Sequence, residues 1–269
     1  MLIDSEVHFW NHDISNSHPS FRGNKLLAQH YLPEQLTQSL HRNGIQGCIA
    51  VAAENQEVET RFLAELAFTH PEILGVVGWT DLGHPQADDK IRELRQYTPI
   101  KGFRYPVDGG PEPKAQVMEL LLVYQYTLEL SIGPGTDLAA LSGWIQYNPE
   151  QHFILRNCGN PDTSGNPVDV WKNQIRVLAK SKNLTCKLSG LLTAAKGKSW
   201  KPADFYPFLD LVFDAFGAER LLFASDWPFL LLAGIYVQWK SLLEKFTEKF
   251  SAEDRRLIFG ENASRIYRL

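Results

Sequence analysis

The stretch Leu221-Leu222-Phe223-Ala224-Ser225-Asp226-Trp227-Pro228 is a short apolar run that ends in a carboxylate, an indole and a proline. Near the other end of the chain, Leu2-Ile3-Asp4-Ser5-Glu6-Val7-His8-Phe9-Trp10 likewise runs from apolar residues into an acid, an imidazole and an indole. In a (β/α)₈ barrel, catalytic groups lie where the strands end, at the carboxyl-terminal rim. The two stretches therefore predict a first and a last strand that meet at one site.

Short apolar runs alternate with amphipathic segments along the whole chain. The runs that predict strands are 2–8, 47–53, 74–81, 100–105, 127–132, 152–157, 184–189 and 221–226. Between them, apolar residues recur at helical spacing, as Leu32, Leu36 and Leu40 do. This alternation predicts parallel strands joined by right-handed crossovers. Eight such units in 269 residues favour a (β/α)₈ TIM barrel over an open sheet, and no linker divides residues 1–269, which we expect to form a single domain.

The composition argues against several classes of function. The chain has 27 Lys and Arg against 31 Asp and Glu, a net charge of −4, and no basic block that would indicate nucleic-acid binding. No stretch approaches the roughly 18 apolar residues of a membrane helix, and the first residues lead us to expect no secretory signal. The three cysteines lack CxxC spacing, which is typical of reduced cytoplasmic thiols. We expect a cytoplasmic protein that acts on a small-molecule substrate, and a homo-oligomer is compatible with this composition.

Three residues at the predicted strand ends form a candidate catalytic group. Because alternate strand residues point the same way, Glu6 and His8 are both predicted to face the barrel mouth. Asp226 ends the last strand, which neighbours the first in a closed barrel. Carboxylate and imidazole ligands of this kind suit zinc or manganese. The alternative is that Glu6 and His8 only bond loop backbone, although a buried Glu without a partner is costly.

Other residues near the strand ends are candidates for substrate binding. Arg104 is suited to a bidentate contact with a substrate carboxylate, and its alternative role is a surface ion pair. Tyr105 and Asn157 are weaker candidates, of which Asn157 offers an amide oxygen. Trp10 and Trp227 are predicted to wall the pocket, since aromatic faces suit sugar or planar rings, or else to belong to the core.

Two further expectations concern the surroundings of this pocket. Arg156 has the opposite parity to Asn157, so it is predicted to point away from the mouth and to pair with an acid behind it. The polar segment 11–29, which contains His12 and His18, is too long for a tight turn and is expected to form a rim loop.

Seven short motifs occur in the order of a known family. They are Asp4-x-x-x-His8-Phe9-Trp10, Val77-Gly78-Trp79-Thr80-Asp81-Leu82, Lys101-Gly102-Phe103-Arg104, Cys158-Gly159-Asn160-Pro161, Cys186-Lys187-Leu188-Ser189-Gly190-Leu191, Ser225-Asp226-Trp227-Pro228 and Phe259-Gly260-Glu261-Asn262-Ala263. Together they resemble the amidohydrolase-related (amidohydrolase 2) family, of the fuconolactonase and 2-pyrone-4,6-dicarboxylate lactonase type. The resemblance implies a distorted TIM barrel of the amidohydrolase superfamily. It also implies hydrolysis of a lactone of a sugar acid or aromatic breakdown product, with Asp226 handling the proton of water.

The chain departs from the family pattern at two places. Where the family usually has His-x-His on strand one, this chain has Glu6-Val7-His8, and Arg156-Asn157 replaces the usual Asp-His on strand six. Glu-x-His also resembles the metal-dependent decarboxylases of the superfamily, but these carry a further His on strand five, which 128–132 lacks. Zinc or manganese on Glu6, His8 and Asp226 is therefore one version of the site, and lactone opening without a metal, which the resemblance also suggests, is the other.

The leading interpretation is a hydrolase that opens a small lactone bearing a carboxylate or several hydroxyls. Asp226, ionised at neutral pH, acts as the general base, and His8 and Arg104 bind and polarise the substrate. Glu6 is either a metal ligand or a second proton carrier. Two other readings stay open: a metal-dependent decarboxylase of an aromatic acid, and a barrel that binds a ligand without catalysis.

Overall fold

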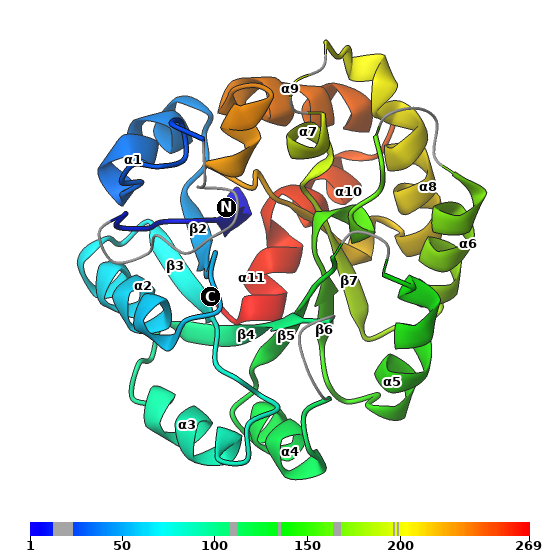
Figure 1. The fold of residues 1–269 in the computed structure, drawn as a ribbon. Coiled ribbons are helices and arrows are strands. Elements are labelled where there is room, and N and C mark those ends of the chain that lie inside the picture. Colours follow the sequence, from blue (N-terminus) through cyan, green and yellow to red (C-terminus); the bar gives the residue numbers. More distant parts are fainter. Residues whose placement is uncertain (13–23, 108–111, 134–135, 164–167, 196, 198) are drawn as a thin grey trace.

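The computed structural model describes residues 1–12, 24–107, 112–133, 136–163, 168–195, 197 and 199–269. Much of the expected rim loop, including His18, lies outside these residues. Eight parallel strands follow one another around a single sheet, each paired with the next in the sequence. Helices surround the strands (Figure 1), so the predicted (β/α)₈ barrel is confirmed. Among the described residues, no helix has both the length and the apolar composition needed to cross a bilayer.

All eight predicted strands are present. They are β1 (Ile3–Val7), β2 (Gly47–Val51), β3 (Ile73–Gly78), β4 (Ile100–Pro106), β5 (Thr127–Ser131), β6 (Phe153–Leu155), β7 (Leu184–Leu188) and β8 (Leu221–Phe223). β6 and β8 are shorter than predicted. Asn157 and Asp226 adopt φ values of 53° and 60°, in the left-handed region, which a strand cannot accommodate. The chain therefore leaves the sheet just where polar side chains are presented.

The structure describes eleven helices, most of which lie on the outside of the sheet. They are α1 (Pro33–Arg42), α2 (Glu57–Thr69), α3 (Ala87–Leu94), α4 (Ala115–Val123), α5 (Leu141–Tyr147), α6 (Asp169–Leu178), α7 (Leu191–Ala194), α8 (Tyr206–Phe216), α9 (Tyr236–Thr247), α10 (Ala252–Arg256) and α11 (Asn262–Tyr267). In α8, Phe208, Val212 and Phe216 are buried, and the helix ends at Gly217, whose φ of 71° favours glycine.

A separate apolar cluster fills the inside of the barrel. Inward-facing residues of the strands pack there against Ile266 and Tyr267 of α11, the red helix in the middle of Figure 1. The Nζ of Lys101, at the start of β4, lies 3.4 Å from the backbone oxygen of Arg268, which follows α11. The last helix therefore closes the amino-terminal end of the barrel and leaves the carboxyl-terminal end for the site.

A bulge in β1 decides which of its side chains point inward. The register against β2 shifts between Asp4 and Val7, and such a bulge reverses the alternation of side chains. Asp4 consequently faces outward, where its Oδ2 accepts a hydrogen bond of 2.8 Å from the hydroxyl of Tyr236 in α9. Its Oδ1 accepts one of 2.9 Å from the backbone N–H of Ser225. Asp4 therefore ties β1 to the segment after β8.

One buried ion pair crosses the barrel interior between β5 and β7. The Nζ of Lys187 lies 2.6 Å from Glu129 Oε2, and both side chains are fully buried. The hydroxyl of Tyr267 donates to the other oxygen of Glu129 at 2.5 Å. Each charge is thus compensated inside a region that water does not reach, which is the condition for a buried pair to be tolerated.

We expect Lys187→Met to lower the free energy of unfolding by about 3–5 kcal/mol, because it leaves the Glu129 carboxylate buried without a cation. Adding Glu129→Gln keeps an acceptor for Tyr267 and removes the charge, so the double variant should be more stable than Lys187→Met alone. Urea denaturation of the three proteins measures this. Purely additive losses would contradict the coupling.

His152, at the amino-terminal end of β6, should make the fold sensitive to acid. Burial, together with Arg265 and Arg268, lowers the pKa of this imidazole to about 4, while in the unfolded chain it stays near 6.5. Between pH 6.5 and 4 the unfolded chain therefore binds more protons, and stability falls as the pH falls. Between pH 7 and pH 4, the free energy of unfolding of His152→Gln should fall by up to about 3 kcal/mol less than that of the natural protein. Chemical denaturation of both proteins at both pH values measures this difference. Equal losses in both proteins would contradict this.

Candidate active site

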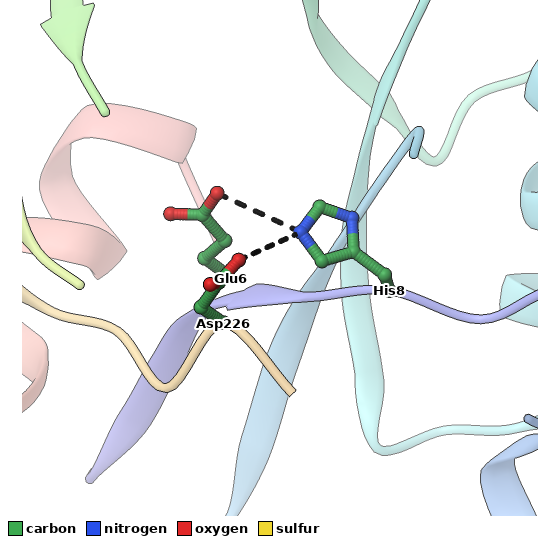
Figure 2. A group of neighbouring side chains, drawn as sticks. All are labelled: Glu6, His8 and Asp226. Atoms are coloured by element: carbon green, nitrogen blue, oxygen red, sulfur yellow. Dashed lines mark ion pairs between the residues drawn. The ribbon is translucent and has the colours of Figure 1, made fainter. Parts of the chain in front are cut away.

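Glu6, His8 and Asp226 lie together at the carboxyl-terminal end of the barrel (Figure 2). The Nε2 of His8 is 3.7 Å from Glu6 Oε1 and 3.4 Å from Asp226 Oδ1. In Figure 2 both carboxylates face this same ring nitrogen. All three side chains are buried, so their charges interact with little screening by water.

Backbone hydrogen bonds between β1 and the segment after β8 bring these side chains together. The N–H of Asp226 donates to the carbonyl of Glu6 at 3.0 Å, and the N–H of His8 donates to the carbonyl of Trp227 at 2.7 Å. Val7 and Trp227 form a parallel bridge between these two bonds. The contact between β1 and the segment after β8 therefore both closes the barrel and forms the base of the site.

The ring of His8 is oriented by a backbone carbonyl. Its Nδ1 lies 2.7 Å from the oxygen of Val51, and because a carbonyl only accepts, Nδ1 carries a proton. Nε2 is left to face the two carboxylates. Burial lowers the pKa of His8, but the contacts with Asp226 and Glu6 outweigh it, so that this pKa is raised overall.

One oxygen of the Asp226 carboxylate accepts a hydrogen bond, and the other faces His8. Its Oδ2 accepts a hydrogen bond of 2.7 Å from the hydroxyl of Thr193, in α7. Burial raises the pKa of Asp226, and the Glu6 charge raises it further against the opposing effect of His8. Its φ of 60° is a strained conformation for this residue, of a kind that clusters at functional sites.

Arg156 does not point away from the mouth, and that prediction is wrong. Its Nε donates to Glu6 Oε1 at 2.6 Å, and its Nη2 contacts the same oxygen. The physical reason is strand alternation: Ile154 faces the barrel interior, so Arg156 does too. Asn157 also lines the pocket, because the chain has by then left the strand conformation.

The guanidinium of Arg156 is held on several sides. Nη1 donates to the hydroxyl of Ser131 at 2.8 Å, and Nη2 lies 3.3 Å from His8 Nε2. Burial would raise the pKa of Glu6, but the Arg156 and Lys187 cations outweigh it and hold that pKa well below its ordinary value. Glu6 is therefore an ionised carboxylate paired with a cation.

These residues open onto a cavity of about 390 Å³, a size typical of small-molecule sites. Its lining comprises His8, Ala53, Arg104, Ser131, Ile132, Arg156, Asn157, Asn160, Thr193, Asp226 and Phe229. Sequence reasoning did not single out Ser131, Asn160, Thr193 or Phe229. Asn160 belongs to the Cys158–Pro161 motif, and Ser131 ends β5 on the same face as Glu129, so strand alternation could have indicated it. Thr193, in α7, and Phe229 follow no pattern that we could read from the sequence.

Arg104 lines the cavity with a guanidinium that is only partly satisfied. Its Nη2 donates to Asn55 Oδ1. Within the part of the chain that the structure describes, its Nε is buried without a hydrogen-bond partner. Burial first, and then Arg156, lower the pKa of Arg104 to about 10, so it remains a cation at neutral pH. A buried, unpaired N–H beside a cavity is costly unless a ligand satisfies it.

The three aromatic residues predicted near the pocket pack with other rings. Trp10 packs against Tyr31 and Phe229, Trp227 against Phe9 and Tyr31, and Tyr105 against Trp144. None of the three contributes to the lining of the described cavity. A role in substrate binding for Trp10, Trp227 and Tyr105 stays a prediction.

The spacing of Glu6, His8 and Asp226 suits a metal ion, but their partners do not. The candidate ligand atoms lie within 4.8 Å of one another. Glu6 Oε1 is already occupied by Arg156, and Glu6 Oε2 lies 2.8 Å from the hydroxyl of Ser189. A divalent ion among these atoms would also adjoin a fixed guanidinium. The residues present therefore do not fit a divalent metal.

A model of the amidohydrolase family matches residues 3–269. The chain belongs to this family. An L-fucono-1,5-lactonase from Burkholderia multivorans is 32% identical over 287 residues, covering 100% of this chain and 96% of that protein. The crystal structure of an amidohydrolase from Burkholderia multivorans with bound zinc has a TM-score of 0.89 at 31% identity, covering 100% of this chain and 99% of the other. The predicted family is thus confirmed.

A more distant structure shares the fold. Dihydroxybenzoic acid decarboxylase from Polaromonas sp. JS666, with bound manganese, is 15% identical with a TM-score of 0.65, covering 100% of this chain and 97% of the other. At this identity the likeness concerns the barrel alone. Zinc and manganese are thus found in proteins of the same fold, while this chain has a buried Glu, His and Asp beside an arginine.

Proposed function

We propose that this protein is a hydrolase that opens a small lactone, with Asp226 as the general base. The observation that carries the proposal is the buried Asp226 carboxylate, which has one oxygen held by Thr193 and the other turned toward His8 at the cavity. The 32% identity to an L-fucono-1,5-lactonase along the whole chain supports the same reaction class.

Asp226 would take a proton from a water molecule in the cavity. Its raised pKa makes it a stronger base than an exposed aspartate, and general-base catalysis improves as that pKa approaches the working pH. The hydroxide equivalent adds to the lactone carbonyl and gives a tetrahedral oxyanion. Collapse breaks the ring C–O bond, and the proton on Asp226 passes to the departing alkoxide, so lactone plus water gives one hydroxy acid.

His8 would orient and polarise the reacting groups, and the cations of the cavity would bind the substrate. The Nε2 of His8 lies between the carboxylates and Arg156, a position from which it can orient water against Asp226. A lactone is an activated ester and tolerates weaker activation of water than an amide does. This matters here because a metal, which lowers the pKa of bound water to about 7, does not fit the residues present.

The lining favours a lactone that carries a carboxylate or several hydroxyls. Arg104 offers a buried N–H and a positive charge, and Asn157 and Asn160 offer amide groups. Arg is well suited to carboxylate recognition because its guanidinium donates in a fork. A cavity of about 390 Å³ accommodates a single small ring with such substituents.

The structure argues against the decarboxylase alternative. That reading needs a further imidazole from strand five. β5 instead turns Glu129 inward to pair with Lys187, and Ser131 to pair with Arg156. The non-catalytic alternative predicts binding of sugar acids without turnover, so assays of lactone turnover by the natural protein distinguish it.

Asp226→Asn should lower kcat for sugar-acid and dicarboxylate lactones by about 10²–10⁴-fold, since an amide cannot accept the proton of water. Titration of released acid measures the rate. Asp214→Asn, which changes the same group on the exposed face of α8, is the matched control and should keep full activity. Unchanged turnover in Asp226→Asn would overturn the mechanism, and no turnover of any lactone by the natural protein would favour the binding alternative.

Arg104→Met should raise KM for carboxylated lactones by about 10- to 100-fold, the loss of one charge-assisted hydrogen bond, and should leave kcat nearly unchanged. Neutral polyhydroxylated lactones should be affected much less. Steady-state kinetics on matched pairs of charged and neutral lactones tests this. An equal rise in KM for both kinds would show that Arg104 does not recognise a carboxylate.

A further inference from the structure

We infer that the guanidinium of Arg156 replaces a divalent metal ion in the cluster of Glu6, His8 and Asp226. The cluster would then carry its own cation and work without a metal. This inference does not rest on the identity of the substrate, because its test measures metal binding rather than turnover.

Arg156 occupies the position that a metal ion would take in the cluster. Arg156 Nη2 contacts Glu6 Oε1 and lies 3.3 Å from His8 Nε2, the two atoms that this pair of residues would offer to a metal. Glu6 Oε1 also accepts a 2.6 Å bond from Nε of the same guanidinium. An ion bound to both atoms would have to displace Arg156 from this place.

Hydrogen bonds and burial hold Arg156 in this position. Nη1 is held by the hydroxyl of Ser131, at the end of β5, and the side chain is almost fully buried. Glu6 is fixed from the other side by Ser189, which follows β7. A guanidinium paired in this way keeps its charge, since arginine does not lose its proton in proteins. Moving the guanidinium away from Glu6 would leave a buried charge without its partner, which is costly.

The charges of the cluster and the cavity are balanced without a metal ion. The cluster holds two carboxylates, Glu6 and Asp226, and the adjoining cavity holds two cations, Arg156 and Arg104. The four charges cancel before any metal is added. A divalent ion would give this buried site an excess of two positive charges, which low-dielectric surroundings strongly disfavour.

Removing the guanidinium should therefore convert the cluster into a metal site. Arg156→Met keeps most of the side-chain volume and frees the Glu6 carboxylate, and it should raise the affinity for Zn²⁺ by about 100-fold or more over the natural protein. Arg156→Lys keeps a cation and should stay close to the natural protein. Arg104→Met removes the same charge from the cavity but leaves Arg156 on Glu6 Oε1 and beside His8 Nε2, so its affinity for Zn²⁺ should rise much less than that of Arg156→Met.

The measurement is equilibrium dialysis of each protein against Zn²⁺ and, separately, Mn²⁺, with bound metal determined by elemental analysis and thermal unfolding followed in parallel. Only Arg156→Met should be stabilised by added metal, because ligand binding to the folded state raises its stability. Should Arg156→Met fold poorly, refolding it with and without Zn²⁺ gives the same comparison.

Metal binding by the natural protein tests the inference without any substitution. After treatment with a chelator, it should bind no stoichiometric Zn²⁺ or Mn²⁺ and should unfold at the same temperature with or without either ion. One tightly bound equivalent of metal in the natural protein, or equal gains in affinity for Arg156→Met and Arg104→Met, would overturn the inference. Neither result would affect the lactonase proposal, which depends on the turnover of Asp226→Asn.

Discussion

The short parallel contact between β1 and the segment after β8 is the constraint on which the site depends. Two backbone hydrogen bonds, from Asp226 to Glu6 and from His8 to Trp227, close the barrel and place the acid and the imidazole side by side. Asp4, on the outer side of β1, reinforces this contact through Ser225 and Tyr236. Because backbone bonds have narrow geometric limits, the separation of His8 and Asp226 follows from closure.

Electrostatics then decide what the assembled groups can do. Glu6 is buried, which by itself would favour its neutral form, yet Arg156 and Lys187 keep it ionised. The same guanidinium lies against His8, so one cation neutralises a carboxylate and occupies the space between the strand ends. The relative with bound zinc shows that the fold accommodates a metal ion. In this chain the charges around Glu6 are already balanced by arginine.

Much of the architecture could be predicted from local patterns, and the site only in part. Eight apolar runs became eight strands, and Glu6, His8 and Asp226 converge as their positions at strand ends suggested. The predicted direction of Arg156 was wrong because alternation was applied relative to Asn157, which lies outside the strand. Alternation relative to Ile154, which lies within β6, gives the observed inward direction. Trp10 and Trp227 were predicted to wall the pocket or to belong to the core; they pack against rings distant in the chain, and their role in substrate binding stays a prediction.

The sequence by itself determined the succession of strands and helices, the family and the chemical types at the strand ends, because hydrophobic periodicity and short motifs are properties of neighbouring residues. Only the tertiary structure decided that Arg156 meets Glu6 and His8, and that Arg104 faces the cavity with an N–H that no other described residue pairs. Interactions between charges depend on their distance and on burial, and for residues far apart in the chain both arise only when the barrel closes.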